Sequence, residues 1–155
     1  MRPLGSLRAD LFCIQEFVNN NIALFEMYDC LSAHLAESLE IIYDIECEEF
    51  RDDVIDALGF EFGPEIIWHL NVTRLDVASG HRGNRVGVRA LGLLRRFVQR
   101  EGLIVTLKAF PDAKGHPGAA AIRKLSRYYV GSGELGLVEA GKPSGGWLTG
   151  NWSLR

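Results

Sequence analysis

The most informative segment of this 155-residue sequence is Val77-Ala78-Ser79-Gly80-His81-Arg82-Gly83-Asn84-Arg85-Val86-Gly87. An apolar run ends where the stretch begins, glycines follow, and a helical pattern starts at its end. The first turn of a helix has free backbone N–H groups and a partial positive charge, and this geometry binds phosphate without a catalytic side chain. Glycine lets a ligand approach the backbone closely, and arginine adds charge-assisted contacts to phosphate oxygens. We therefore expect a phosphate-binding turn between a strand and a helix.

Three other interpretations of this turn compete with the first. The dinucleotide-binding fingerprint needs three spaced glycines and a later acidic residue, and the match is poor. The ATP-binding P-loop needs Gly-Lys-Ser/Thr, which is absent. A plain strand–helix connection with two chance glycines stays open on the motif alone.

The segments on both sides of the turn predict a parallel pair of strands. A central strand is expected over Glu65–Ala78, where parts of the run are apolar on both faces. Apolar residues recur at helical spacing over Val86–Glu101, and a second core strand follows over Leu103–Phe110. A strand–helix–strand order of this length implies parallel strands joined by a crossover.

The remaining segments predict helices and two hairpins. A polar loop (Asp112–Pro117) and a helix (Gly118–Tyr129) lead to a terminal hairpin, whose strands Glu134–Ala140 and Trp147–Leu154 flank the turn Gly141–Gly146.

The N-terminal part predicts a hairpin followed by two helices. Phe, Ile, Leu and Val are frequent over Ala9–Val18 and Ile22–Cys30, and the cluster Asn19-Asn20-Asn21 between them is typical of a turn. A helical interpretation of the same stretch is also open, because it has no Gly or Pro. Helices are then expected over Ala33–Asp44, capped by Ser32, and over Glu48–Leu58, ended by Gly59. Together the elements predict an α/β fold with a mixed sheet, as one domain over residues 1–155.

Composition and charge exclude several classes of protein. No apolar run approaches the roughly 20 residues of a membrane helix, and the N-terminus lacks a signal-peptide pattern, so we expect a cytoplasmic protein that is not bound to a membrane. The three cysteines and four histidines are scattered, and no metal site is expected. Eleven acidic residues and one basic residue lie between Glu37 and Glu65, whereas fourteen basic and five acidic residues follow. A nucleic-acid binder is usually basic overall, and this chain has a net charge of −3.

The turn resembles the acyl-CoA signature of the GNAT N-acetyltransferase superfamily, roughly Val-x-Pro-x-Tyr-Arg-Gly-x-Gly-x-Gly. Val77, Arg82, Gly83 and Gly87 match directly, and His81 takes the aromatic place. The resemblance covers about residues 66–133, where a strand, a proline and a helix follow in the family's order. The chain departs from the pattern at four positions: Ser79 replaces the proline, Arg85 a glycine, Ile122 an Asn of the later helix and Glu134 a Phe.

The resemblance implies that acetyl-CoA is the co-substrate and that an amine attacks its thioester directly in a ternary complex. Backbone groups of Leu75, Asp76 and Val77 would bind the pantetheine arm like an added strand. The pyrophosphate would lie on the turn formed by Arg82, Gly83, Asn84, Arg85, Val86, Gly87 and Val88. Positioning of the two reactants would supply most of the rate.

Two residues are the predicted catalytic groups. Tyr129 would act as the general acid for the departing CoA thiolate, and the alternative is that it only packs the helix end. Asp76 would act as the general base, directly or through water, and the alternative is a salt bridge to Arg74 or Arg82. His69 and His81 are weaker candidates for the base. Trp147 and Trp152 are expected to pack in the core or hairpin.

Three hypotheses for function follow. The first is an acetyl-CoA-dependent N-acetyltransferase that acts on a primary amine of a small molecule or protein. The second is a GNAT-like CoA-binding or protein-interaction module without catalysis, which the departures at Arg85, Ile122 and Glu134 suggest. The third is a phosphate-ligand domain unrelated to CoA. The acidic stretch permits a cationic acceptor, and the terminal hairpin permits a homodimer.

Overall fold

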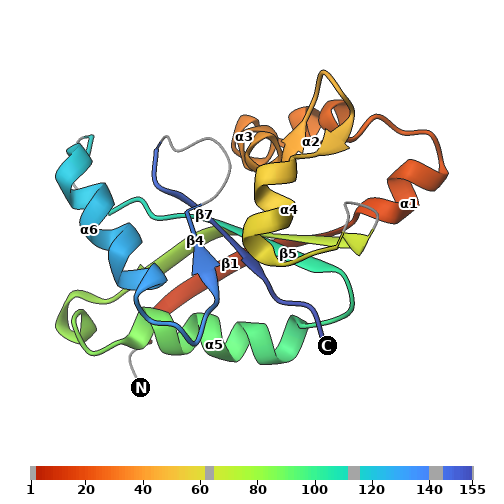
Figure 1. The fold of residues 1–155 in the computed structure, drawn as a ribbon. Helices are drawn as coiled ribbons and strands as arrows, with labels where there is room; N and C mark the ends of the chain where they lie inside the picture. The colour runs from red at the N-terminus through yellow and green to blue at the C-terminus, as the bar shows by residue number, and fades with distance from the viewer. Residues whose placement is uncertain (1–2, 62–64, 112–115, 140–144, 155) are drawn as a thin grey trace.

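The computed structural model describes residues 3–61, 65–111, 116–139 and 145–154. Its centre is a five-stranded mixed sheet with the order β1-β4-β5-β7-β6 (Figure 1). The strands are β1 (Gly5–Cys13), β4 (Trp68–Val77), β5 (Leu103–Lys108), β6 (Leu137–Val138) and β7 (Trp147–Asn151). Only β4 and β5 are parallel, and every other neighbouring pair is antiparallel. The α/β class and the mixed sheet predicted from the sequence are thus confirmed.

Helices cover both faces of this sheet (Figure 1). Helices α5 (Val86–Val98) and α6 (Ala119–Val130) contribute to a core cluster with Leu70, Val105 and Leu148 of the sheet. We call the face of the sheet that bears this cluster the α5 face. The N-terminal helices contribute to a second cluster on the opposite side, which we call the α3 face.

The predicted strand–turn–helix–strand unit is present. Strands β4 and β5 pair in parallel from Trp68↔Leu103 to Val72↔Leu107, and α5 connects them. Val88 and Leu91 are buried on the inner side of α5, as their helical spacing predicts. The helix ends at Val98 rather than at Glu101, as helix ends predicted from a pattern often differ by a turn.

The predicted N-terminal hairpin is wrong. The first strand is β1, which pairs with β4, and the rest of the stretch forms helices α1 (Ile14–Asn19) and α2 (Leu24–Leu31). Leu24 and Tyr28 are one helical turn apart and both are buried, so tertiary packing selects the helical alternative that the absence of Gly and Pro left open. The Asn cluster forms the end of α1, where Asn21 has a positive φ of 55°.

The next two helices form with altered limits. Ser32 caps α3 (Ala33–Ile42), because its Oγ accepts a hydrogen bond from the backbone N–H of Leu35 at 3.2 Å. A two-stranded sheet of β2 (Tyr43–Asp44) and β3 (Glu49–Phe50) then replaces the predicted helix start at Glu48. Helix α4 (Asp52–Leu58) follows and ends at Gly59 with φ 69°, as predicted.

The predicted C-terminal hairpin is present as the antiparallel pair β6–β7. The predicted turn Gly141–Gly146 and loop Asp112–Pro117 lie partly outside the described residues. Trp147 and Trp152 are both buried, as expected.

A bulge in β4 separates the two halves of that strand. Arg8 pairs with Arg74 and Ala9 with Val72, so Thr73 is an extra residue without a partner in β1. Val72 and Leu75 consequently face the same side although they are three residues apart. The pairing of β4 with β5 also ends here, since Val72↔Leu107 is its last pair.

Candidate functional site

The turn predicted to bind phosphate follows the end of β4. A short 3₁₀ helix, Ser79–His81, leads to Gly83, whose φ is 83°, and then to Arg85 at the N-cap of α5. Arg85 has φ 57° and ψ 19°, the left-handed conformation that glycine adopts at least cost. Arg85, which replaces a glycine of the family signature, thus keeps a backbone conformation suited to glycine.

The backbone N–H groups of this turn are available. Within the part of the chain that the structure describes, no hydrogen bond is made by the N–H groups of residues 83–88. The first N–H of α5 with an acceptor belongs to Arg89, which donates to the carbonyl of Arg85 at 2.9 Å. Free donors at a helix start, together with the helix dipole, make a binding site for an anion.

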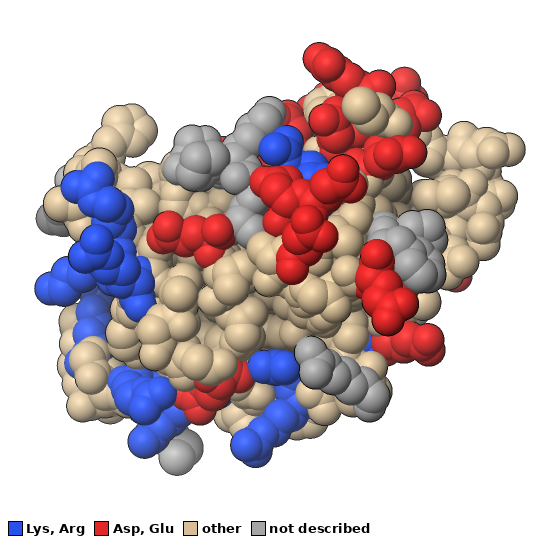
Figure 2. Space-filling model, viewed as in Figure 1, with Lys and Arg blue, Asp and Glu red and all other residues tan. Residues whose placement is uncertain are grey.

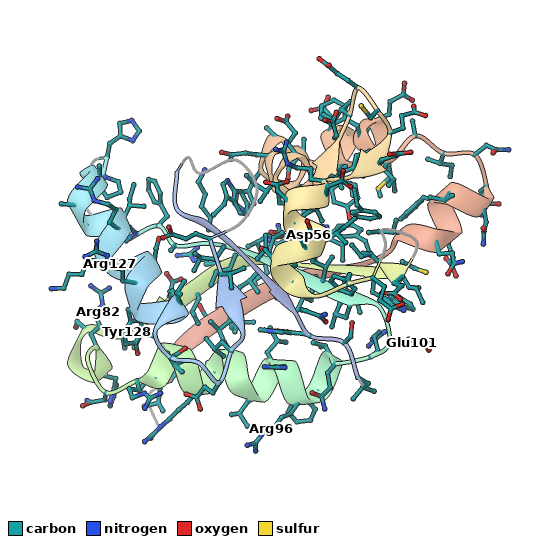
Figure 3. The ribbon with its side chains drawn as sticks, viewed as in Figure 1. Asp56, Arg82, Arg96, Glu101, Arg127 and Tyr128 are labelled. Atoms are coloured by element: carbon teal, nitrogen blue, oxygen red, sulfur yellow. The ribbon has the colours of Figure 1, made fainter. Side chains whose placement is uncertain are left out.

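The two arginines of the turn contact other parts of the protein. Arg82 donates from Nε to the carbonyl of Val77 at 3.0 Å. Arg85 forms an ion pair with Glu134, with Nη2 and Oε1 2.8 Å apart. Arg85 and Glu134, which both differ from the family signature, therefore contact each other, and both side chains are more than half exposed. In Figure 3, Arg82 lies at the same end of the molecule as Arg127 and Tyr128 of α6, whereas Arg96 lies toward the far end of α5.

The hydroxyl of Tyr129 lies beside Gly87, at the end of the turn. A Cβ built on Gly87 would lie 3.3 Å from Tyr129 Oη, 3.6 Å from Leu75 Cδ2 and 3.8 Å from Val77 Cγ2. The structure therefore brings together four of the predicted site residues on the α5 face. Burial, and after it the neighbouring Tyr128, raises the pKa of Tyr129 to about 12. Its hydroxyl is protonated at neutral pH and can donate a proton or a hydrogen bond.

Asp76 lies on the other face of β4. Its side chain forms an ion pair with Arg74, one of the two partners considered from the sequence, and accepts a hydrogen bond from Ser6 Oγ at 3.4 Å. Since side chains alternate along a strand, Asp76 faces away from Leu75 and Val77, which point toward Gly87. The structure thus separates the two predicted catalytic groups, Tyr129 and Asp76, onto opposite faces.

Among the described residues, no strand pairs with β4 beyond Val72 on the side of β5. Ala78 donates its N–H to the carbonyl of Leu4, on the side of β1. Backbone groups alternate in direction along an antiparallel pair, so Asp76 also points toward β1 and the groups of Leu75 and Val77 point away from it. Leu75 and Val77, two of the three residues predicted to bind a pantetheine arm, thus direct their backbone groups to the open edge. The carbonyl of Val77 already accepts a hydrogen bond there from Arg82 Nε.

The surface around the turn is basic. Figure 2 shows Lys and Arg over α5 and α6, and Asp and Glu mainly over the region of α2 to α4. A groove of about 470 Å³ along α5 is lined by Val88, Arg89, Gly92, Leu93, Arg95, Arg96, Gln99 and Glu134. This side of the molecule suits an anionic ligand and the other side a cationic one.

A buried hydrogen-bond chain crosses the α3 face, and the sequence did not reveal it. Thr106 Oγ1 donates to Asn71 Oδ1 at 3.1 Å, so it accepts from His69 Nε2, 2.8 Å away. The remaining ring nitrogen, Nδ1, then accepts from Tyr28 Oη at 2.8 Å. All four side chains are fully buried. His69 is therefore a core histidine, and His81, in the turn, is exposed.

The described residues contain no cluster of His, Cys, Asp and Glu that could hold a metal ion. In the same residues, no helix has the length and apolar character needed to cross a bilayer. No protein-family model, curated protein or solved structure is detectably similar to this chain. The resemblance of the turn to the GNAT signature stays a prediction.

Proposed function

We propose that this chain is an acetyl-CoA-dependent N-acetyltransferase with a GNAT-like fold, which moves an acetyl group to a primary amine in the cytoplasm. One observation carries the proposal: the unpaired edge of β4 leads directly into a turn whose N–H groups, residues 83–88, have no acceptor among the described residues. An extended ligand with amide groups and a pyrophosphate matches this combination, because amides can pair with a strand edge and phosphates with a helix start. CoA has both parts.

Each part of the site then has a role. The backbone groups of Leu75 and the N–H of Val77 hydrogen-bond the pantetheine arm, while the Val77 carbonyl accepts from Arg82 Nε. The N–H groups of the turn hold the pyrophosphate. Tyr129 donates a proton to the departing thiolate, since its hydroxyl is protonated at neutral pH and lies beside the start of α5. Most of the rate comes from holding thioester and amine together.

The amine loses a proton in this reaction, and Asp76 takes it through water in our proposal. Its carboxylate lies on the α3 face, opposite Tyr129, beside the ion-paired Arg74. This arrangement requires the amine to approach from the α3 face and acetyl-CoA from the α5 face. The two faces meet along the unpaired edge of β4, where the acetyl group would lie.

Calorimetric titration with acetyl-CoA tests the binding site. We expect binding in the micromolar range, with adenine nucleotides and free phosphate as competitor controls. Arg82→Glu places a negative charge in the turn and should weaken binding at least tenfold. Arg96→Glu makes the same charge reversal toward the other end of α5 and should have a much smaller effect (Figure 3). Unchanged binding by Arg82→Glu would contradict the assignment of the turn.

Turnover of Tyr129→Phe tests the chemistry. Loss of a general acid should lower kcat about 100-fold or more while acetyl-CoA still binds. A variant with unchanged kcat would mean that Tyr129 only packs against Gly87.

The ion pair between Arg85 and Glu134 favours a second candidate, a GNAT-like CoA-binding or protein-interaction module without catalysis. It joins the turn to the segment after α6, at two positions where the family pattern differs. CoA binding without thioester consumption over a broad panel of amines would support this candidate. Binding of phosphate or nucleotides in preference to CoA would instead support a phosphate-ligand domain.

A further inference from the structure

A lysine at the end of β5 is held by an acidic and an aromatic side chain. Lys108 Nζ lies 2.9 Å from both Oε1 and Oε2 of Glu37, on α3. The same nitrogen lies 5.3 Å from the centroid of the Trp147 ring. The Lys108 side chain is 22% exposed and Trp147 is buried, whereas Glu37 is 48% exposed, so the ammonium lies between a buried ring and a carboxylate that reaches the surface. A carboxylate and an aromatic face are the groups that recognise alkylammonium ions.

Lys108, Glu37 and Trp147 form a cluster at the point where the pairing of β4 with β5 ends. Lys108 directly follows Leu107, the last residue of β5 that pairs with β4. It pairs with Trp147 of β7, so both side chains are on the same face of the sheet. That face is the α3 face, because Lys108 contacts Glu37 of α3. The ammonium is therefore beside the end of the β4–β5 pairing, on the face from which an amine would approach.

His34 adds a hydrogen-bond acceptor to the cluster. Its ring lies 5.1 Å from the Trp147 ring, and its buried Nε2 has no partner within the described part of the chain. Burial first, and then the charge of Lys108, lowers the pKa of His34, while Glu37 and Asp10 act in the opposite direction. A neutral imidazole can accept a hydrogen bond from an ammonium N–H through its unprotonated ring nitrogen.

We propose that Glu37, Trp147 and His34 form the binding site for the primary ammonium group of the acceptor, and that Lys108 is an internal occupant of this site. The inference rests on the proposed function and names its acceptor as a cationic primary alkylamine. The acceptor displaces Lys108, and its charge then makes the same contacts. The acidic surface over α2 to α4 attracts such a cation (Figure 2).

The test is a titration with n-butylammonium chloride, which copies the end of a lysine side chain, followed by the NMR signal of the Trp147 indole N–H. Lys108→Met removes the occupant and keeps an apolar stem of similar length. We expect this variant to bind n-butylammonium at least tenfold more tightly than the unmodified chain. Lys124→Met, an exposed lysine on α6, is the matched control and should bind as the unmodified chain does.

Two further variants identify the site. Glu37→Gln in the Lys108→Met background should abolish the gain, because the carboxylate is gone. Lys108→Arg keeps a cation in the site and should bind no more tightly than the unmodified chain. Unimproved binding by a folded Lys108→Met variant, or tight binding that survives Glu37→Gln, would overturn the inference.

The titration needs no CoA, so its result is separate from that of the proposed function. Amine binding without acetyl-CoA binding would retain the ammonium site and reject the transferase. Acetyl-CoA binding with no amine effect in any of these variants would retain the cofactor site and reject the ammonium site.

Discussion

Acidification should destabilise this protein through His69, because the buried hydrogen-bond chain holds that ring neutral. Complete burial lowers the pKa of His69 to about 3, from 6.5 for an exposed histidine. Both ring nitrogens make hydrogen bonds: Nε2 donates to Thr106, and Nδ1 accepts from Tyr28. A proton added to Nδ1 would break the contact with the Tyr28 hydroxyl proton and place a charge in the core.

The sign and size of the effect follow from proton linkage. The folded pKa lies below the unfolded one, so between pH 6.5 and about 3 the unfolded chain binds one more proton. Stability is therefore fully present above pH 6.5 and falls as the pH falls, by about 1.4 kcal/mol per pH unit. Between pH 6.5 and 4.5 the loss is about 3 kcal/mol, a large part of the 5–15 kcal/mol typical of a domain.

Urea unfolding at pH 7.0, 6.0, 5.0 and 4.5 measures this loss. His69→Gln cannot be protonated in this range, so its free energy of unfolding should start lower but fall less steeply. The carboxylates that titrate in acid affect both proteins alike. The difference between the two slopes of unfolding free energy against pH therefore gives the contribution of His69. His116→Gln, at an exposed position, is the matched control and should follow the unmodified chain. Equal slopes for His69→Gln and the unmodified chain would mean that protonation of His69 does not contribute to the loss of stability.

Three other substitutions test the packing and the turn. Trp152→Phe removes the Nε1 donor that bonds the carbonyl of Leu135 at 2.7 Å, and should lower the free energy of unfolding by about 1–3 kcal/mol in urea. Leu91→Ala, in the core under α5, should cost about 2–5 kcal/mol in the same assay, and a smaller cost would mean that α5 packs loosely. Arg85→Gly places a glycine at a left-handed backbone position, which favours folding, and removes the exposed ion pair with Glu134, which opposes it. The free energy of unfolding should therefore change by no more than about 1 kcal/mol. Calorimetry should show that this variant binds acetyl-CoA more tightly, and weaker binding would mean that the guanidinium contributes to the site.

The elements that sequence predicts well are those whose local signals agree with the final packing. The spacing of Val88 and Leu91 indicates the buried side of α5, and both residues are buried there. Ser32 and Gly59 mark a helix start and a helix end through contacts within a few residues. Such features depend on neighbours in the chain, so a pattern can reveal them.

The N-terminal part shows where local pattern fails. The stretch Ala9–Cys30 is rich in residues that suit strands, and its Asn cluster suits a turn. Only its first part, up to Cys13, is a strand, since it finds β4 as a partner. The later part lacks a strand partner and instead buries Leu24 and Tyr28 as helical neighbours. The available partner, and not intrinsic preference, decides between strand and helix here.

Local patterns are sufficient to predict the strand that ends near residue 77, the glycine-bearing turn, the helix after it and the second strand. The contacts around this unit depend instead on tertiary packing. The β4–β5 pairing ends at Val72, which leaves the later part of β4 without a strand partner on that side among the described residues. The contacts of Arg85 with Glu134 and of Lys108 with Glu37 join residues 49 and 71 positions apart. Contacts at such separations depend on how the sheet and helices pack, and no local pattern in a single sequence records them.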